Sequence, residues 1–245
     1  MKSISVPKGS IQPGRTKLDT IFLTRPKNAQ ERAYSYLKEQ IVNLQLPPGR
    51  KLRAQEFAGI LKLSRTPIRE ALGRLAQERL VHRDSGWGYT VVPMTFKEIL
   101  DLFKIRESLE ILAALEALPN LAAENLNLLK SILDKSERLL KAGRHAEFRA
   151  ASRKFHMTIS ALARVPLLHH ILLGINDRIR LVAAMQVDVR HQRAAEILAE
   201  NRRIWRALPR KGPRQVRAAV LAHIHNARNG LLKRVGVAPS MFRFE

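Results

Sequence analysis

The sequence predicts a mainly α-helical chain in two parts. The first part is a small domain of three helices and a β-hairpin, and the second is an all-α bundle of about six helices. Two observations lead to this prediction: apolar residues recur at helical spacing along most of the chain after Ala29, and two short extended runs flank Ser85-Gly86. A length of 245 residues also favours more than one domain.

The composition of the chain favours some binding partners and excludes some kinds of site. A net charge of +23 attracts polyanions, nucleic acid above all. The chain has no cysteine, which excludes disulfides and zinc sites with Cys ligands. No apolar run approaches the roughly 20 residues that span a bilayer, so we expect a cytoplasmic protein with no membrane partner.

Changes in pattern divide the chain into four segments. Residues 1–27 mix proline and glycine with basic and small polar residues, and we expect a disordered basic arm there. Residues 28–94 carry the small domain and residues 95–233 the helical bundle. Residues 234–245 are expected to form a loose tail.

Two helices are expected at the start of the small domain. The first buries Tyr34 and Leu37 and ends before the Leu-Pro-Pro-Gly of residues 46–49, because proline cannot continue a helix. The second runs from about residue 54 to 61 and is expected to pack its apolar residues, Phe57, Ile60 and Leu61.

The third helix has an apolar face and a basic face. Ser64 is a suitable N-cap, and Pro67 is tolerated only in a first turn, so the helix begins there. Its first turn presents Arg65 and Arg69, whose guanidinium groups suit phosphates and the paired acceptors of guanine in a major groove. The alternative interpretation of this stretch alone is a solvated amphipathic helix.

Three motifs stand at fixed points of this domain: LPPG at 46–49, SRTPIREAL at 64–72 and ERLV at 78–81, before the glycine-bearing hairpin. Together they resemble the winged helix-turn-helix of GntR-type bacterial regulators. The resemblance implies a homodimer on a pseudo-palindromic double-stranded DNA operator, although Arg79 stands where the family usually has glycine. The candidate DNA-binding residues are Ser64, Arg65, Thr66, Arg69, Arg74, Arg53, Ser85 and Gly86.

The bundle begins with a capping box, in which Thr95 precedes Glu98 by three residues. Its first helix is expected to run to about Leu118 with Ile105 and Leu112 on the buried side. Further helical patterns lie at about 122–140, 146–162, 167–188, 190–208 and 213–231.

The opening LFKIRESLE of residues 102–110 resembles the FCD-type effector domain of the FadR branch of the same family. Many members of that branch hold a divalent metal with one Asp and three His and bind a small organic acid beside it. At the matching positions this chain has Ser152, His156, Asn201 and His223. Amide and hydroxyl oxygens are weak neutral ligands, so zinc or nickel is disfavoured, with only weak candidate ligands in His156, Asn201 and His223.

The resemblance also places an arginine, here Arg106, where its planar fork would grip a ligand carboxylate. The alternative is an intrahelical pair between Arg106 and Glu110 or Glu107. The two histidines could likewise be ordinary core residues. The candidate ligand-binding residues are therefore Arg106, Ser152, His156, Asn201 and His223.

The expected function is a sequence-specific DNA-binding repressor whose operator affinity responds to a small anionic metabolite. The alternative is a ligand-independent nucleic-acid-binding protein with a degenerate effector pocket. An RNA-binding module is disfavoured because aromatic residues, which stack on bases, make up only 5% of the chain. We expect no enzyme, because Ser152 and His156 lack an evident acid to orient the imidazole.

Overall fold

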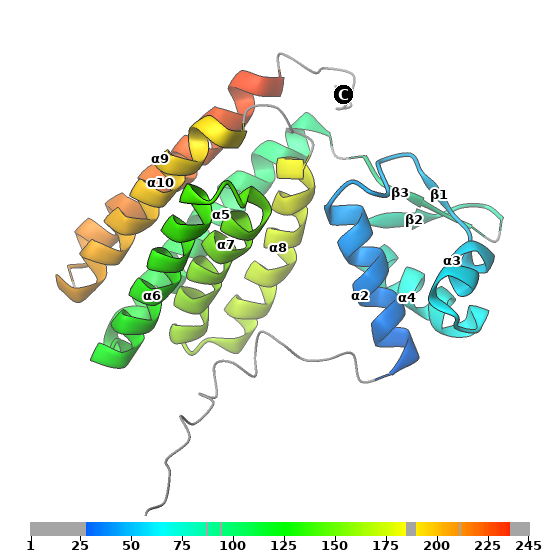
Figure 1. Ribbon diagram of the computed structural model, residues 1–245, viewed down its shortest axis with the longest axis horizontal. Coiled ribbons are helices and arrows are strands. Elements are labelled where there is room, and N and C mark those ends of the chain that lie inside the picture. The colour runs from blue at the N-terminus through cyan, green and yellow to red at the C-terminus, as the bar shows by residue number, and fades with distance from the viewer. Residues whose placement is uncertain (1–27, 87, 94, 185–189, 211, 236–245) are drawn as a thin grey trace, which may run out of the picture.

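The computed structural model describes residues 28–86, 88–93, 95–184, 190–210 and 212–235. The arm expected at residues 1–27 and all but the first two residues of the expected tail lie outside this part. Figure 1 shows two bodies side by side, a small domain and a helical bundle, as the sequence predicts.

The small domain contains three helices and a three-stranded antiparallel sheet in the order β1-β3-β2. Its elements are α2 (Ala29–Val42), β1 (Lys51–Leu52), α3 (Ala54–Leu61), α4 (Arg65–Gln77), β2 (Val81–Arg83) and β3 (Tyr89–Val91). The hairpin of β2 and β3 confirms the predicted wing. The sequence did not predict β1, because two residues are too short for a strand pattern.

The core of this domain lies between α2 and α4, where Leu37, Leu72 and Leu75 are fully buried. The prediction that α3 packs Ile60 is wrong, because that side chain is exposed. Among helices, α3 packs mainly against α4, so its buried face is narrow and includes Phe57 but not Ile60.

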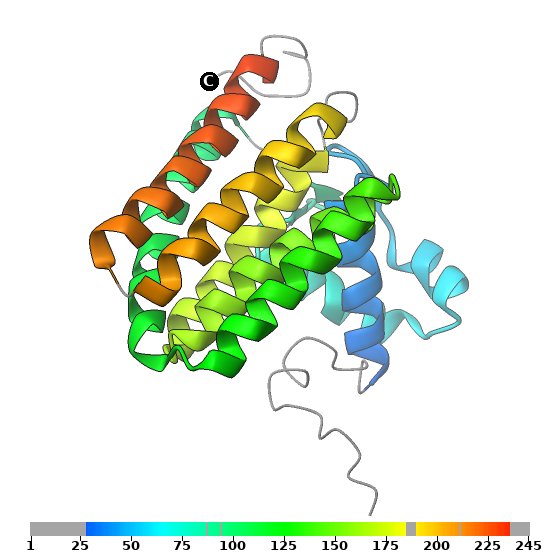
Figure 2. The same ribbon diagram turned by 60° about the vertical axis from the view of Figure 1, so that its left-hand side comes forward.

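The bundle consists of six α-helices within the described residues. They are α5 (Phe96–Ala117), α6 (Ala123–Lys141), α7 (His145–Leu162), α8 (Pro166–Ala184), α9 (Arg190–Ala207) and α10 (Pro213–Val235), with a short 3₁₀ turn after α5 and another after α9. Helix α5 contacts α7, α8 and α10, and Figure 2 shows the long helices running side by side. Helix α10 ends two residues beyond the expected boundary at 233.

Helix α5 begins as predicted: the Glu98 amide donates to Thr95 Oγ1 at 3.1 Å, and the Thr95 amide donates to Glu98 Oε2 at 2.8 Å. Its buried face was predicted less well, since Ile105 and Leu112 are exposed. Both residues lie on a side of α5 that the contacting helices leave open. None of the helices in the described part of the chain is long and apolar enough to cross a bilayer.

The two bodies meet where α2 lies against α8 (Figure 1). Ion pairs join the helices, with Lys38 Nζ 2.6 Å from Asp177 and Arg180 Nη2 2.8 Å from Glu39. This contact connects the bundle to the helix that packs on α4.

Candidate functional site

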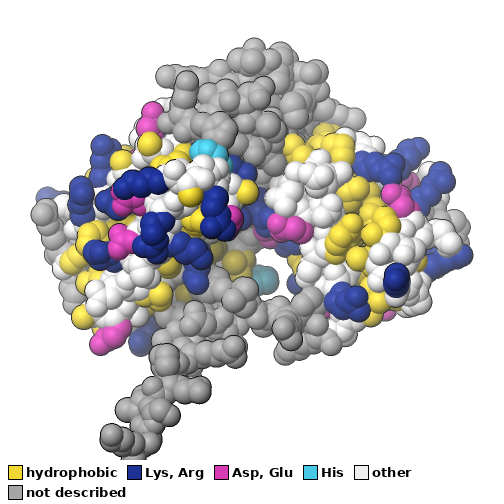
Figure 3. All heavy atoms as spheres, viewed as in Figure 1, with side chains coloured by type: hydrophobic (Ala, Val, Ile, Leu, Met, Phe, Trp, Pro, Cys, Tyr) yellow, Lys and Arg dark blue, Asp and Glu magenta, His cyan; other side chains and the backbone are white. Residues whose placement is uncertain are grey.

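A basic hollow of about 790 Å³ lies on the small domain, between β1, the start of α4 and the turn of the hairpin. Its charged lining consists of five cations and one carboxylate: Lys51, Arg53, Arg65, Arg69, Arg83 and Asp84. Figure 3 shows Lys and Arg side chains gathered over this end of the molecule. Such a surface attracts a polyanion.

Helix α4 aims its first turn at this hollow because its opposite side is fixed in the core. Ile68 and Leu72 are fully buried, which leaves Arg65 and Arg69 exposed beside the wing. Ser64 occupies the N-cap position, but within the described residues its side chain makes no capping hydrogen bond. The first-turn amides and the helix dipole add to the positive potential there.

The candidate DNA-binding residues separate into two groups. Five of them line the hollow: Arg53, Arg65, Arg69, Ser85 and Gly86. Ser64 and Thr66 are exposed at the same end of α4 without lining it. Arg74 lies elsewhere, with its guanidinium 3.7 Å above the ring of Tyr34 and its Nε 3.6 Å from Glu78. Sequence reasoning missed Lys51 and Arg83, although Arg83 directly precedes the hairpin turn.

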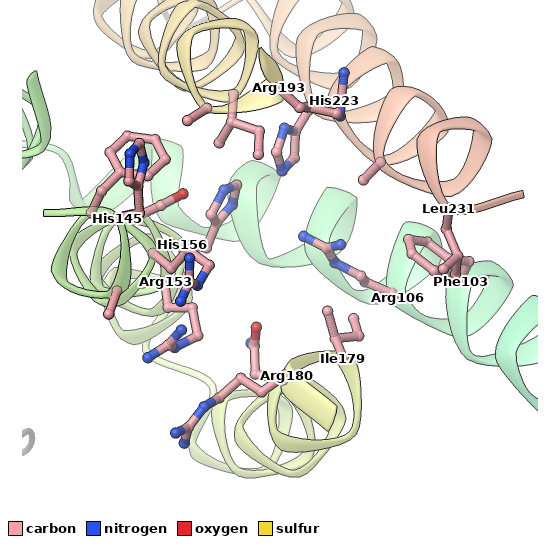
Figure 4. Close-up of a pocket in the computed structure, with 18 of the residues that line it drawn as sticks. Phe103, Arg106, His145, Arg153, His156, Ile179, Arg180, Arg193, His223 and Leu231 are labelled. Atoms are coloured by element: carbon pink, nitrogen blue, oxygen red, sulfur yellow. The ribbon is translucent and has the colours of Figure 1, made fainter. Parts of the chain in front are cut away.

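A second cavity of about 410 Å³ lies inside the bundle, between α5, α7, α8, α9 and α10, and Asn43 of the small domain reaches its wall (Figure 4). One part of its lining is apolar, including Phe103, Phe148 and Ile179. The other part carries five arginines and three histidines: Arg106, Arg149, Arg153, Arg180, Arg193, His145, His156 and His223.

Glu110 does not line the cavity itself, but it contacts two residues that do, Arg106 and His156. Its side chain is only 6% exposed, Arg106 Nε donates to its Oε1, and its Oε2 lies 3.1 Å from His156 Nδ1. Burial alone would raise the pKa of the Glu110 carboxyl, but the positive charge of Arg106 and the contact with His156 outweigh burial and hold that pKa well below its ordinary value. Glu110 is therefore ionised and balances the arginine.

A chain of hydrogen bonds joins the candidate ligand residues. His156 Nε2 lies 3.0 Å from Asn201 Oδ1, and Asn201 Nδ2 donates to Ser152 Oγ at 2.9 Å. The rings of His156 and His223 stack with centroids 4.7 Å apart. Asn201 is almost fully buried and supports the cavity wall from behind, whereas the other four candidate residues line it.

His223 is held by Glu200, whose Oε2 lies 2.9 Å from its Nδ1. Burial lowers the pKa of the His223 imidazole to about 4, and nearby His156 and Arg106 act in the same direction, against the hydrogen bond that His223 makes to Glu200. At neutral pH His223 is thus uncharged.

Known families match both bodies. Residues 29–91 match the family described as "Bacterial regulatory proteins, gntR family", and residues 101–226, half of the chain, match the "FCD domain". The chain belongs to the GntR family of regulators. It is a transcriptional regulator of that family with an FCD effector domain, as the sequence motifs predicted.

Individual GntR-family proteins resemble it over most of its length. The HTH-type transcriptional regulator YdhC of Bacillus subtilis is 29% identical over 210 residues, which are 85% of this chain and 93% of YdhC. McbR of Escherichia coli is 28% identical over 156 residues, 64% of this chain and 68% of McbR. The solved structure of E. coli McbR/YncC shares the fold with a TM-score of 0.77 at 22% identity, covering 84% of this chain and 98% of that one.

The metal site that the FadR-branch resemblance implies does not suit the residues present. The four matching side chains include no carboxylate, and three of them, Ser152, His156 and Asn201, are hydrogen-bonded to one another. The described residues contain no group of three or more His, Cys, Asp or Glu side chains placed to hold a metal ion. Five arginines in the same cavity lining further disfavour a divalent cation.

Sequence reasoning also missed most of the basic lining of this cavity. Arg149, Arg153 and His156 follow one another at spacings of four and three on α7, which is a signal for a shared helical face. Arg180 and Arg193 lie on α8 and α9, and only the packing of the bundle brings them to the same cavity.

Proposed function

We propose that this chain is a homodimeric transcriptional repressor that binds a pseudo-palindromic DNA operator and whose operator affinity is changed by a small organic anion. The observation that carries the proposal is the basic hollow between the first turn of α4 and the wing. In this arrangement α4 enters a major groove with Arg65 and Arg69, while Ser85 and Gly86 meet the backbone beside it.

The anion occupies the cavity in the bundle. Arg106 uses its Nε for Glu110, and its terminal nitrogens point into the cavity (Figure 4). A carboxylate can accept both terminal N–H groups of such a fixed guanidinium. The arginines then supply the charge that a metal supplies in other members of the branch, and we propose that this chain binds its ligand without a tightly held metal.

The dimer forms through an apolar face of the bundle. Ile105 and Leu112 on α5 are exposed, as are Leu167 and Ile171 on α8, a helix that packs against α5. Several exposed apolar side chains on two neighbouring helices favour an interface at this surface. Two copies joined here would present two α4 helices to the half-sites of one operator.

The function is tested by sequencing genomic DNA fragments that the purified protein captures and titrating one of them by fluorescence anisotropy. We expect a pseudo-palindromic site with at least about a hundredfold preference over an unrelated duplex. Preferential binding to single-stranded RNA, or no sequence preference, would contradict the proposal. An operator affinity that no small organic acid changes would favour the ligand-independent alternative.

A further inference from the structure

Three arginines gather at the end of the bundle cavity that meets the small domain. Arg149 and Arg153 lie one turn apart on α7, and Arg180 lies on α8. Asn43, the residue directly after α2, lines the same cavity, and Arg180 Nη2 lies 3.4 Å from Asn43 Oδ1. In Figure 4, Arg153 and Arg180 lie on one side of the cavity, with Arg106 and Phe103 on the other. Arg106 and this arginine cluster therefore lie on different sides of the cavity.

Nearby carboxylates do not balance this three-arginine cluster. Arg180 Nη2 donates to both oxygens of Glu39 at 2.8 Å, and its Nη1 lies 3.6 Å from Asp177. Asp177 is shared with a lysine of α2. In the part of the chain that the structure describes, neither Arg149 nor Arg153 has a carboxylate oxygen within 4.0 Å. Two of the three arginines, Arg149 and Arg153, thus keep a positive charge without a direct counterion, whereas Arg180 is paired with Glu39.

The surroundings of Arg153 destabilise its charged form. Burial lowers the pKa of Arg153 to about 10, the nearby positive charges of Arg180 and Arg149 act in the same direction, and Glu39 offsets only part of the effect. Burial also lowers the pKa of Arg149. A bound anion would relieve both the repulsion and the missing solvation.

We propose that Arg149, Arg153 and Arg180 form a second anionic subsite and that the effector carries two negatively charged groups, one at Arg106 and one at this cluster. This inference rests on the proposed function, in which the cavity binds an anionic effector. A volume of about 410 Å³ suits a small metabolite, and the apolar lining accommodates the hydrocarbon part between the charges. Either a carboxylate or a phosphate can be the second group, because a guanidinium pairs with both.

The second subsite also gives the effector a direct route to the small domain. An oxyanion at the cluster competes with Glu39 for Arg180, and this pair joins α8 to α2. Helix α2 packs on α4, which carries the residues proposed to read DNA. A group bound at the cluster therefore changes the contact that sets the position of α4 relative to the bundle.

Isothermal titration of the full-length protein with three probes tests the proposal. Adipate and 3-phosphoglycerate each carry two anionic groups, as two carboxylates or as a carboxylate and a phosphate, and hexanoate carries one. We expect at least one two-group probe to bind ten times more tightly than hexanoate. In Arg153→Gln this advantage should fall below threefold. Arg178→Gln, a matched loss of charge on α8 outside the cavity lining, should retain it.

The outcomes separate this inference from the proposed function. If hexanoate binds and Arg106→Lys weakens it, but neither two-group probe binds more tightly, the second subsite is wrong and the effector cavity stands. If the advantage persists in Arg153→Gln, the cluster is not the subsite. If none of the three probes binds, both the subsite and the anionic effector are contradicted.

Discussion

Arg106 and Glu110, one helical turn apart on α5, form a buried ion pair whose side chains are 8% and 6% exposed. The pair realises the intrahelical alternative considered for Arg106, yet the same arginine lines the cavity. Arg106 therefore fits both the intrahelical pair and the ligand-facing position, because its Nε donates to Glu110 and its terminal nitrogens face the cavity.

This pair makes Arg106→Ala a poor test of ligand binding. Removing the arginine leaves the Glu110 carboxylate buried with much of its charge uncompensated, which should cost about 3–5 kcal/mol of unfolding free energy. Urea unfolding measures the loss. In the double variant Arg106→Ala with Glu110→Gln, more than half of that stability should return. Equal losses in the single and double variants would show that the carboxylate is not the cause.

Arg79 follows the end of α4 with φ +57°, a left-handed conformation that favours glycine. This explains why glycine is usual at the position in the family. We expect Arg79→Gly to stabilise the protein by about 1 kcal/mol and to raise Tm by a few degrees. Arg79→Ala keeps a Cβ atom and should give no such gain. A lower Tm for the glycine variant would refute the strain argument.

Local signals explain how much of the fold could be predicted. Helix α2 ends before Pro47, as expected, Thr95 and Glu98 cap α5, and the pattern around Ile68 defines the core side of α4, all within a few residues of sequence. Ile105 shows the limit of such signals. Periodicity shows that α5 has an apolar face, but it does not show which part of that face another helix covers.

The bundle cavity could be predicted only in part for the same reason. The family resemblance pointed to Arg106, His156 and His223, which do line the cavity. The partner carboxylate of His156 is Glu110 on another helix, and Arg180 reaches Glu39 in another domain. Such pairings arise from tertiary packing, which no spacing in the sequence reveals.

Acid should destabilise the protein over the pH range between the unfolded and folded pKa values of His223. Its pKa is about 4 when folded, against an ordinary value of 6.5, so as pH falls through 6.5 the unfolded chain takes up a proton before the folded one does. The free energy of unfolding should fall by on the order of 3 kcal/mol between pH 6.5 and 4. His223→Gln should flatten urea-unfolding stability in that window, whereas a variant of exposed His170 should keep the slope. An unchanged slope in His223→Gln would contradict the assignment.

The apolar face of α5 and α8 should control assembly. Leu167 is 69% exposed, and Leu167→Glu should convert a dimer to a monomer at micromolar concentration because it places a charge in the proposed interface. Sedimentation velocity measures this directly. Ile60→Glu changes a similarly exposed apolar residue of α3 and should leave the dimer intact. Persistence of the dimer in Leu167→Glu would place the interface elsewhere.

In the proposed function, the first turn of α4 reads duplex DNA. The most direct measurement is a salt-dependent anisotropy titration of the captured operator with Arg69→Ala and with Arg138→Ala, a matched change on α6 of the bundle. We expect Arg69→Ala to weaken binding more than tenfold, with a shallower salt dependence if a phosphate contact is lost, and Arg138→Ala to match the unmodified protein. If a folded Arg69→Ala variant binds the operator with unchanged affinity, the first turn of α4 does not read the DNA.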